Sequence, residues 1–156
     1  MSLVHAKLYQ SDDLGRVPFA SYTGDLMESL FRSYGADRQK IRYSVDAEGV
    51  DLTISVAAPV GLLLSEIASN ALKYAFPKGR AGTLAIALRR EPNGGYALTV
   101  QDDGVGLPPN FEERAAASLG VRLIDQLVQQ MNGTLQRSSS PVGVTYHIAF
   151  PAEPER

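Results

Sequence analysis

Cysteine and tryptophan are absent from the 156-residue sequence, and histidine occurs only twice. The lack of cysteine excludes a disulfide framework, a thiol nucleophile, a zinc ribbon and an iron–sulfur site. Two histidines also argue against a histidine-based metal site. Positive charge is not in excess either, because 15 Lys and Arg residues face 17 Asp and Glu residues. The net charge of −2 excludes a general nucleic-acid binder, so any anion must be held at a local site.

Long hydrophobic runs are missing as well. No apolar run approaches the roughly 18 residues of a membrane span, and the N-terminus lacks the charged and apolar regions of a signal peptide. We therefore expect a cytoplasmic location and a domain that makes no membrane contact. A chain of this length buries roughly 68 to 70% of its unfolded surface, which suffices for one globular core without covalent cross-links.

The apolar pattern predicts three helices and three hairpins. Helical spacing of apolar residues predicts helices over 18–34, 59–76 and 118–131, the last with Ser118 as its N-cap. Alternation of apolar and polar residues predicts hairpins of 41–45 with 50–56, 83–89 with 96–101, and 135–137 with 144–150. The predicted fold class is α+β, a two-layer α/β sandwich with a mixed, largely antiparallel sheet and helices on one face.

A polar stripe interrupts the second predicted helix, which is otherwise apolar nearly all round. At 100° per residue, Glu66, Asn70 and Lys73 fall within an arc of about 60°. An acid, an amide and an amine on such a helix are costly unless they face something polar. The amide oxygen suits a hard cation, the amine suits phosphate, and the carboxylate can accept a proton. The alternative is a solvent-facing stripe in which Glu66 and Asn70 pair at i, i+4.

A glycine loop follows the strand predicted over 96–101, where Asp102 and Asp103 precede Gly104 and Gly106. Glycines two residues apart permit positive φ and close approach of backbone to a ligand. Three alternatives fail on the residues. The P-loop signature is absent, a dinucleotide fingerprint would need glycine where position 109 is proline, and an EF-hand loop starting at residue 99 would lack both required acids.

A second glycine element, Ser118-Leu119-Gly120, lies at the start of the third predicted helix. Backbone amides at a helix N-terminus favour phosphate, and Gly120 would let a phosphate approach closely. An ordinary N-cap followed by a small residue is the alternative interpretation.

Taken in order, these elements resemble a known family. Glu66-x3-Asn70-x2-Lys73, Asp102-x-Gly104-x-Gly106, Ser118-Leu119-Gly120 and Gly143-Val144-Thr145 resemble the N, G1, G2 and terminal glycine-threonine motifs of the GHKL ATPases, whose fold is the Bergerat fold. Within that superfamily, the segments 70–82 and 118–124 look most like sensor histidine kinases of the HisKA_2 type. The stretch 5–14 resembles the end of that family's dimerisation helices.

The resemblance implies a role for each matching residue. Glu66 would orient or deprotonate the attacking group, and Asn70, with Glu66 nearby, would bind Mg²⁺ in the catalytic centre. The nucleotide-binding residues would be Asn70, Lys73, Asp102, Gly104, Gly106, Leu107, Leu119, Gly120 and Thr145. Among these, Lys73 and Gly120 would meet the phosphates of ATP. Asp102 would accept a hydrogen bond from the adenine amino group, and Thr145 would support the adenine end of the site close to Asp102.

The resemblance also implies a domain plan and partners. Residues 1–17 would be the remnant of a dimerisation helical region and linker, 18–151 the catalytic ATP-binding domain, and 152–156 a tail. The domain would transfer the γ-phosphoryl of ATP to a histidine on a dimerisation domain absent from this chain. A response regulator would act downstream, and the full-length protein would be a homodimer. Two alternatives stay open: an anti-sigma-factor-like serine kinase or partner-switching module, and a degenerate domain that binds nucleotide without chemistry.

The sequence departs from the family's pattern in two respects, the residue after Asp102 and the phosphoacceptor histidine. Asp103 stands where many histidine kinases have asparagine, which adds a second carboxylate beside Asp102. His5 lies past the place of the family's phosphoacceptor histidine, and His147 follows the alternation of the last strand, as a structural strand residue does. The isolated chain is therefore expected to bind ATP without being able to phosphorylate itself.

Overall fold

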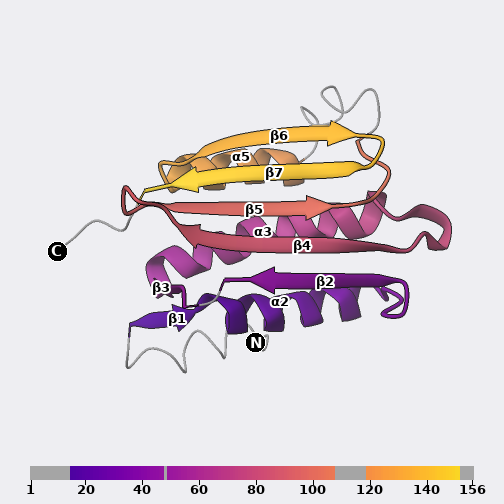
Figure 1. The fold of residues 1–156 in the computed structure, drawn as a ribbon, viewed down its shortest axis with the longest axis horizontal. Helices are drawn as coiled ribbons and strands as arrows, with labels where there is room; N and C mark the ends of the chain where they lie inside the picture. Colours follow the sequence, from indigo (N-terminus) through magenta and orange to yellow (C-terminus); the bar gives the residue numbers. More distant parts are fainter. Residues whose placement is uncertain (1–14, 48, 108–118, 152–156) are drawn as a thin grey trace.

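A computed structural model describes residues 15–47, 49–107 and 119–151. Its main layer is a five-stranded sheet in the order β2-β4-β5-β7-β6 (Figure 1). The strands are β2 (Ile41–Asp46), β4 (Gly82–Arg90), β5 (Tyr96–Asp102), β6 (Thr134–Ser140) and β7 (Gly143–Phe150). A second, small sheet pairs β1 (Arg16–Pro18) with β3 (Asp51–Thr53).

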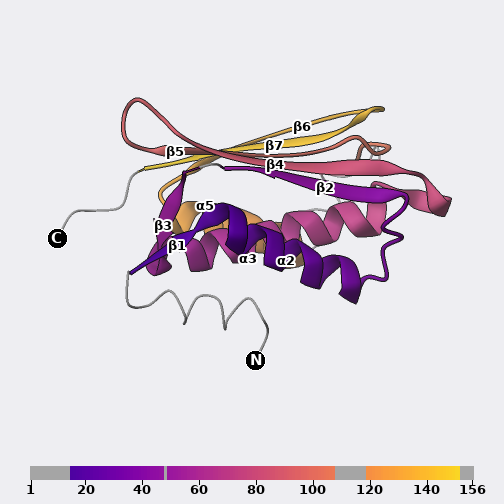
Figure 2. The same cartoon turned by 60° about the horizontal axis from the view of Figure 1, so that its bottom comes forward.

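The helices form the second layer. They are α2 (Phe19–Ser33), α3 (Ile54–Tyr74) and α5 (Leu119–Gln130), and all three cover the same face of the five-stranded sheet (Figure 2). The buried apolar residues of β4, β5 and β7 alternate toward this face, where Leu84, Leu98 and Ile148 are almost completely buried against the helices. The two-layer α+β sandwich with helices on one face is therefore confirmed.

Strand pairing confirms two of the three predicted hairpins. β4 pairs antiparallel with β5, and β6 pairs antiparallel with β7, with the sheet completed between β5 and β7. The first predicted hairpin is wrong. β2 pairs parallel with β4, β3 pairs with β1, and residues 54–56 already belong to α3. Parallel neighbours require a crossover connection, and α3 supplies it by burying its apolar side beneath the sheet.

The predicted helices are largely confirmed, with differences at their ends. α2 matches the predicted helix over 18–34. α3 begins five residues before the predicted start, so that Pro59 lies in its second turn rather than at its first residue. The start of α5 agrees with the prediction, while the proposed cap Ser118 lies outside the described residues. By length and composition alone, α3 is the one described helix able to span a membrane, and here it is the central core helix.

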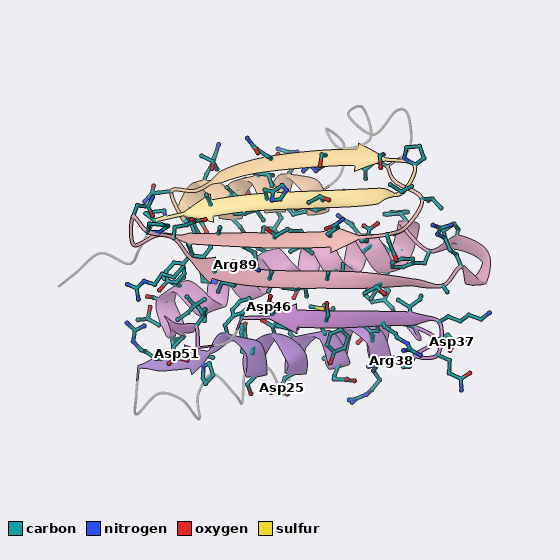
Figure 3. The ribbon with its side chains drawn as sticks, in the orientation of Figure 1. Asp25, Asp37, Arg38, Asp46, Asp51 and Arg89 are labelled. Atoms are coloured by element: carbon teal, nitrogen blue, oxygen red, sulfur yellow. The ribbon has the colours of Figure 1, made fainter. Side chains whose placement is uncertain are left out.

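An ion pair fixes the turn that leads from α2 to β2. The guanidinium of Arg38 donates to both carboxylate oxygens of Glu28, at 2.6 and 3.0 Å, and the hydroxyl of Tyr43 donates to the same carboxylate at 2.8 Å. The hydrogen bonds from Arg38, followed by that from Tyr43, lower the pKa of Glu28 to about 2. Arg38 lies near the end of α2 at the right of Figure 3, whereas the weaker pair of Asp46 with Arg89 joins the end of β2 to β4 near the middle of the picture.

Close packing between α2 and α3 yields a stability prediction. A Cβ added to Gly61 would overlap the hydroxyl of Tyr22, a ring that is only 3% exposed, whereas a Cβ on Gly24 of α2 would meet open space. We expect Gly61→Ala to lower the free energy of unfolding by about 1–3 kcal/mol, because overpacking forces the rigid ring to move. Gly24→Ala should be neutral or stabilising by up to about 1 kcal/mol, because alanine is the better helix former. Urea unfolding of both variants checks this, and equal effects at the two sites would contradict it.

Candidate functional site

Asp102 is a buried acid at the end of β5, with 5% of its surface exposed. Its Oδ1 accepts hydrogen bonds from the backbone N–H of Gly104 at 2.9 Å and of Val144 at 3.3 Å. Both bonds end on the same oxygen. Within the part of the chain that the structure describes, Oδ2 therefore remains free to accept a hydrogen bond from a ligand.

The surroundings of Asp102 raise its pKa. Burial is the largest cause, and the two backbone N–H groups partly offset it, while the charge of Asp103 raises the pKa further. The carboxylate therefore takes up a proton at a higher pH than an ordinary aspartate does. Because the protonated form loses acceptor capacity, a ligand held by Asp102 should be released as the pH falls through this raised pKa.

The glycines of the loop that follows Asp102 allow close contacts with two other elements. The carbonyl of Ala75, just after α3, accepts a hydrogen bond from the N–H of Val105 at 3.0 Å, and a Cβ on Gly104 would overlap that same carbonyl. Gly106 has φ +82° and lies against the carbonyl of Ser140 at the end of β6. Both glycines are therefore required by the packing of the loop between α3 and β6.

Leu107 and the last strand complete the loop's surroundings. The N–H of Leu107 donates to the Oγ of Ser139 at 2.8 Å, and the half-buried leucine side chain packs against the core. The register, however, corrects the predicted place of Thr145. Asp102 pairs with Val144, so Thr145 pairs with Gln101 and shares the outer face of the sheet, away from Asp102 and the helices. Position 144 supports Asp102 through its backbone N–H.

The polar stripe of α3 is retained in the structure. Glu66 and Asn70 are half-buried, and Lys73 is exposed with its Nζ 5.9 Å from the centroid of the Tyr34 ring. Among the described residues, neither the carboxylate of Glu66 nor the amide of Asn70 has a hydrogen bond or ion pair, and no bond joins the two side chains. Glu66 and Asn70 therefore do not pair with each other at i, i+4, and their polar groups remain available to a ligand.

The docking of the loop onto Ala75 brings the stripe and the buried acid to the same end of the molecule. With a rise of about 1.5 Å per residue, Asn70 lies about 7.5 Å and Glu66 about 13 Å along the helix from Ala75. Leu119 and Gly120 begin α5 at the end of the sheet where β5 ends, and the helix runs from there to the opposite end, where β6 begins (Figure 1). The Leu119 side chain lies outside the described part, so the structure places only the backbone of this element.

Tyr74 is a further residue at this end that the sequence reasoning missed. Its side chain is 61% exposed, which is unusual for a large aromatic residue on a core helix. It lies between Lys73 and Ala75, next to the carbonyl that holds the glycine loop. Its exposure and its place near the glycine loop come from the fold, so the only sequence signal is its position directly after Lys73 of the polar stripe.

The donors at this end suit an oxygen-bound cation. No group of three or more His, Cys, Asp or Glu side chains able to hold a metal occurs within residues 15–47, 49–107 and 119–151. The unpartnered amide of Asn70 and carboxylate of Glu66 instead offer two oxygen donors, and Mg²⁺ commonly takes only one or two protein ligands together with substrate phosphates. His147 lies exposed on the outer face beside Thr99, as predicted for a strand residue.

Comparisons with known proteins show the family of the chain. A family model described as histidine kinase-, DNA gyrase B-, and HSP90-like ATPase matches residues 55–154, and one described as histidine kinase matches residues 1–34. Blue-light-activated histidine kinase 2 of Erythrobacter litoralis (strain HTCC2594) is 31% identical over 142 residues, which cover 90% of this chain and 40% of that protein. The chain thus spans about two fifths of this curated relative.

Solved structures show the same architecture. The Erythrobacter litoralis EL346 blue-light activated histidine kinase superposes with a TM-score of 0.83 at 29% identity, over 95% of this chain and 46% of that one. The mycobacterial sensor histidine kinase MprB, with 20% identity and a TM-score of 0.62 over 85% of this chain and 97% of that one, shares the fold. The chain therefore belongs to the ATP-binding family of histidine kinase-, DNA gyrase B- and HSP90-like ATPases.

Proposed function

We propose that this chain is the catalytic domain of a sensor histidine kinase, which binds Mg²⁺-ATP and transfers its γ-phosphoryl group to a histidine on a helical dimerisation domain. One observation carries the proposal. The loop that bears the half-satisfied, buried Asp102 is bonded directly to the helix that bears the unpartnered Glu66 and Asn70. The separation along that helix suits a ligand with a base at one end and a polyphosphate at the other.

The base end of the nucleotide would lie against the glycine loop. The Oδ2 of Asp102 would accept a hydrogen bond from the adenine amino group, and Gly104 and Gly106 would let the loop backbone approach the base. Leu107 would contribute apolar contact, and the exposed ring of Tyr74 would stack on the base, as aromatic rings do. The Thr145 side chain would not contact the base, because the strand register places it on the outer face of the sheet, away from Asp102.

The phosphate end would lie along α3 and the start of α5. Asn70 would hold Mg²⁺ with Glu66 nearby, and Lys73 would place its ammonium near a phosphate. The first backbone N–H groups of α5, at Leu119 and Gly120, would bind phosphate oxygens at the positive end of the helix dipole. When bound, Mg²⁺ supplies charge neutralisation between the phosphates, which is a large part of catalysis in phosphoryl transfer.

Glu66 would handle the proton of the transfer. An imidazole nitrogen of the substrate histidine forms a bond to the γ-phosphorus, and the bond from that phosphorus to the bridging oxygen of ADP breaks. ADP leaves with the bridging oxygen and its electron pair. The carboxylate of Glu66 orients the imidazole and accepts its N–H proton, which needs an acceptor without a competing internal partner.

The full-length protein would work with partners beyond this chain. The match of residues 1–34 to a histidine kinase model supports the assignment of residues 1–17 to a dimerisation region, and it favours a histidine kinase over the anti-sigma-factor-like alternative. We propose a homodimeric, cytoplasmic kinase domain that serves a response regulator. Both partners are inferred from the kinship with proteins named histidine kinases.

Thermal unfolding with nucleotide tests the binding site. A ligand at 100 times its Kd adds about 2.7 kcal/mol of stability, which for a domain of this size raises Tm by about 5–10 °C. Mg²⁺-ADP should therefore raise Tm in a concentration-dependent manner, whereas Mg²⁺ with inorganic phosphate should have little effect. An unchanged Tm at millimolar Mg²⁺-ADP would overturn the proposed site.

A further inference from the structure

The connection between α3 and β4 is bonded to the glycine loop at both of its ends. At the first end, the carbonyl of Ala75 accepts the N–H of Val105 at 3.0 Å. At the second end, the N–H of Thr83 donates to the Oδ1 of Asp103 at 2.7 Å, and the N–H of Asp103 donates to the carbonyl of Thr83 at 3.3 Å. The connection therefore closes a bonded circuit between the end of α3, the start of β4 and the loop.

Arg80 in the connection and Gly82 at the start of β4 make further contacts with the loop. The Nη2 of Arg80 donates to the carbonyl of Asp103 at 3.1 Å. Gly82 packs closely against Asp103 and Phe76. An added Cβ would stand 2.6 Å from the Oδ1 of Asp103 and would overlap the buried ring of Phe76. The connection thus fits the loop only when residue 82 has no side chain.

Asp103 uses a single oxygen in this arrangement. Its Oδ1 is the acceptor for Thr83, and within the described residues its Oδ2 makes no bond. An asparagine, whose Oδ1 is also an acceptor, can make the same bond to Thr83. The requirement at this position is therefore an acceptor, and the negative charge is incidental to it.

We propose that Asp103 is a positioning residue of the nucleotide site, which holds the α3–β4 connection against the glycine loop. The connection in turn fixes Asp102 relative to Asn70 and Lys73 on α3. This inference rests on the proposed function. The two groups that would meet opposite ends of a nucleotide belong to separate elements, and the Asp103 bonds add a second link between these elements beside the bond of Val105 to Ala75.

The proposal separates two kinds of ligand. ADP would contact the loop, Tyr74 at the end of α3 and the stripe residues earlier on that helix, so its affinity depends on the spacing of the loop from the stripe, whereas adenosine would reach only the loop and Tyr74. Loss of the Asp103 bond should therefore weaken ADP binding by about tenfold, the equivalent of one hydrogen bond, and adenosine binding by much less. A merely structural role would lower Tm and leave both affinities unchanged at a temperature where the protein is folded.

The experiment measures the Kd of Mg²⁺-ADP by calorimetry and of adenosine by ligand-observed NMR, with Tm recorded for each variant. Asp103→Ala should lose ADP affinity selectively, and Asp103→Asn should recover most of it. Asp46→Ala, which removes an exposed aspartate at the end of β2, outside the proposed site, is the control and should bind like wild type. If Asp103→Ala does not fold, Gly82→Ala tests the same circuit, with Gly24→Ala as its control.

Three results would overturn the proposal: equal losses for ADP and adenosine, wild-type ADP affinity in Asp103→Ala, or no recovery in Asp103→Asn. Failure of the proposed function itself is distinguishable from these, because the wild-type protein would then bind neither ligand.

Discussion

We expect replacement of Asp102 to abolish the stabilisation of this domain by ADP, and two different replacements distinguish loss of ligand binding from loss of fold stability. Asp102→Ala leaves the N–H groups of Gly104 and Val144 without their acceptor. A buried donor left unsatisfied costs about 1–3 kcal/mol. The alanine variant should therefore both melt at a lower temperature than wild type and show no Tm shift with Mg²⁺-ADP.

Asp102→Asn is the sharper variant. The amide Oδ1 can accept both backbone bonds that the carboxylate accepts, so the loop keeps its internal contacts. The group that replaces Oδ2 becomes an N–H donor, which opposes the adenine amino group and suits the oxygen of a 6-oxo purine. We expect loss of the ADP-dependent Tm shift, with IDP now giving the larger shift of the two.

Thermal shift and calorimetry with ADP and IDP check these expectations for wild type and both variants. Gln101→Ala is a suitable control, because the Gln101 side chain lies on the outer face of the same strand. An ADP shift of normal size in Asp102→Asn would remove Asp102 from adenine recognition. The raised pKa of Asp102 adds an internal check, since the wild-type ADP shift should fade as the pH falls through that pKa.

We expect Glu66→Gln to slow phosphoryl transfer strongly while nucleotide binding persists. The glutamine matches glutamate in size and keeps an oxygen that can contact Mg²⁺, but it cannot take up the imidazole proton. General-base catalysis contributes typically 10²- to 10⁴-fold, so the rate of histidine phosphorylation should fall by about that factor. The Tm shift with Mg²⁺-ADP should stay close to that of wild type.

The measurement is incorporation of label from γ-labelled ATP into the full-length protein, with acid lability identifying phosphohistidine. Glu91→Gln is the matched control, because Glu91 is an exposed acid in the β4–β5 turn at the other end of the sheet. Equal phosphorylation by wild type and Glu66→Gln would show that Glu66 is not the base. A loss of both transfer and ADP binding would instead assign Glu66 to the cation site.

Local patterns predicted the elements whose partners are close in sequence. The β4–β5 and β6–β7 hairpins carry their turn chemistry between the strands, so both could be predicted. The parallel pairing of β2 with β4 could not, because it is decided by the packing of α3 rather than by any residue of β2. Residues 54–56 alternate like a strand, and the burial of α3 overrides that preference.

In the candidate site, too, the sequence predicts the residues of local motifs but not the contacts between distant segments. Asp102 and the polar stripe could be predicted, because polar residues at a defined spacing on an otherwise apolar helix, or directly before a glycine loop, can be seen in the sequence without knowledge of their contacts. Thr145 was misplaced by one residue, and in a strand one residue reverses the face. The part played by Asp103 depends on Thr83 across the strand pair, and a linear motif does not contain that information.

The position of β1 sets a problem of reach for the proposed reaction. Arg16 begins β1, which pairs with β3 ahead of α3, so it lies at the end of the molecule opposite Asp102 (Figure 1). α2 alone separates the two ends by about 22 Å, from its 15 residues. Under the proposed function, a phosphoacceptor helix that stayed beside β1 would be out of range of the γ-phosphoryl group. The catalytic domain would then have to swing relative to that helix, or the histidine would have to come from the second subunit of the proposed dimer.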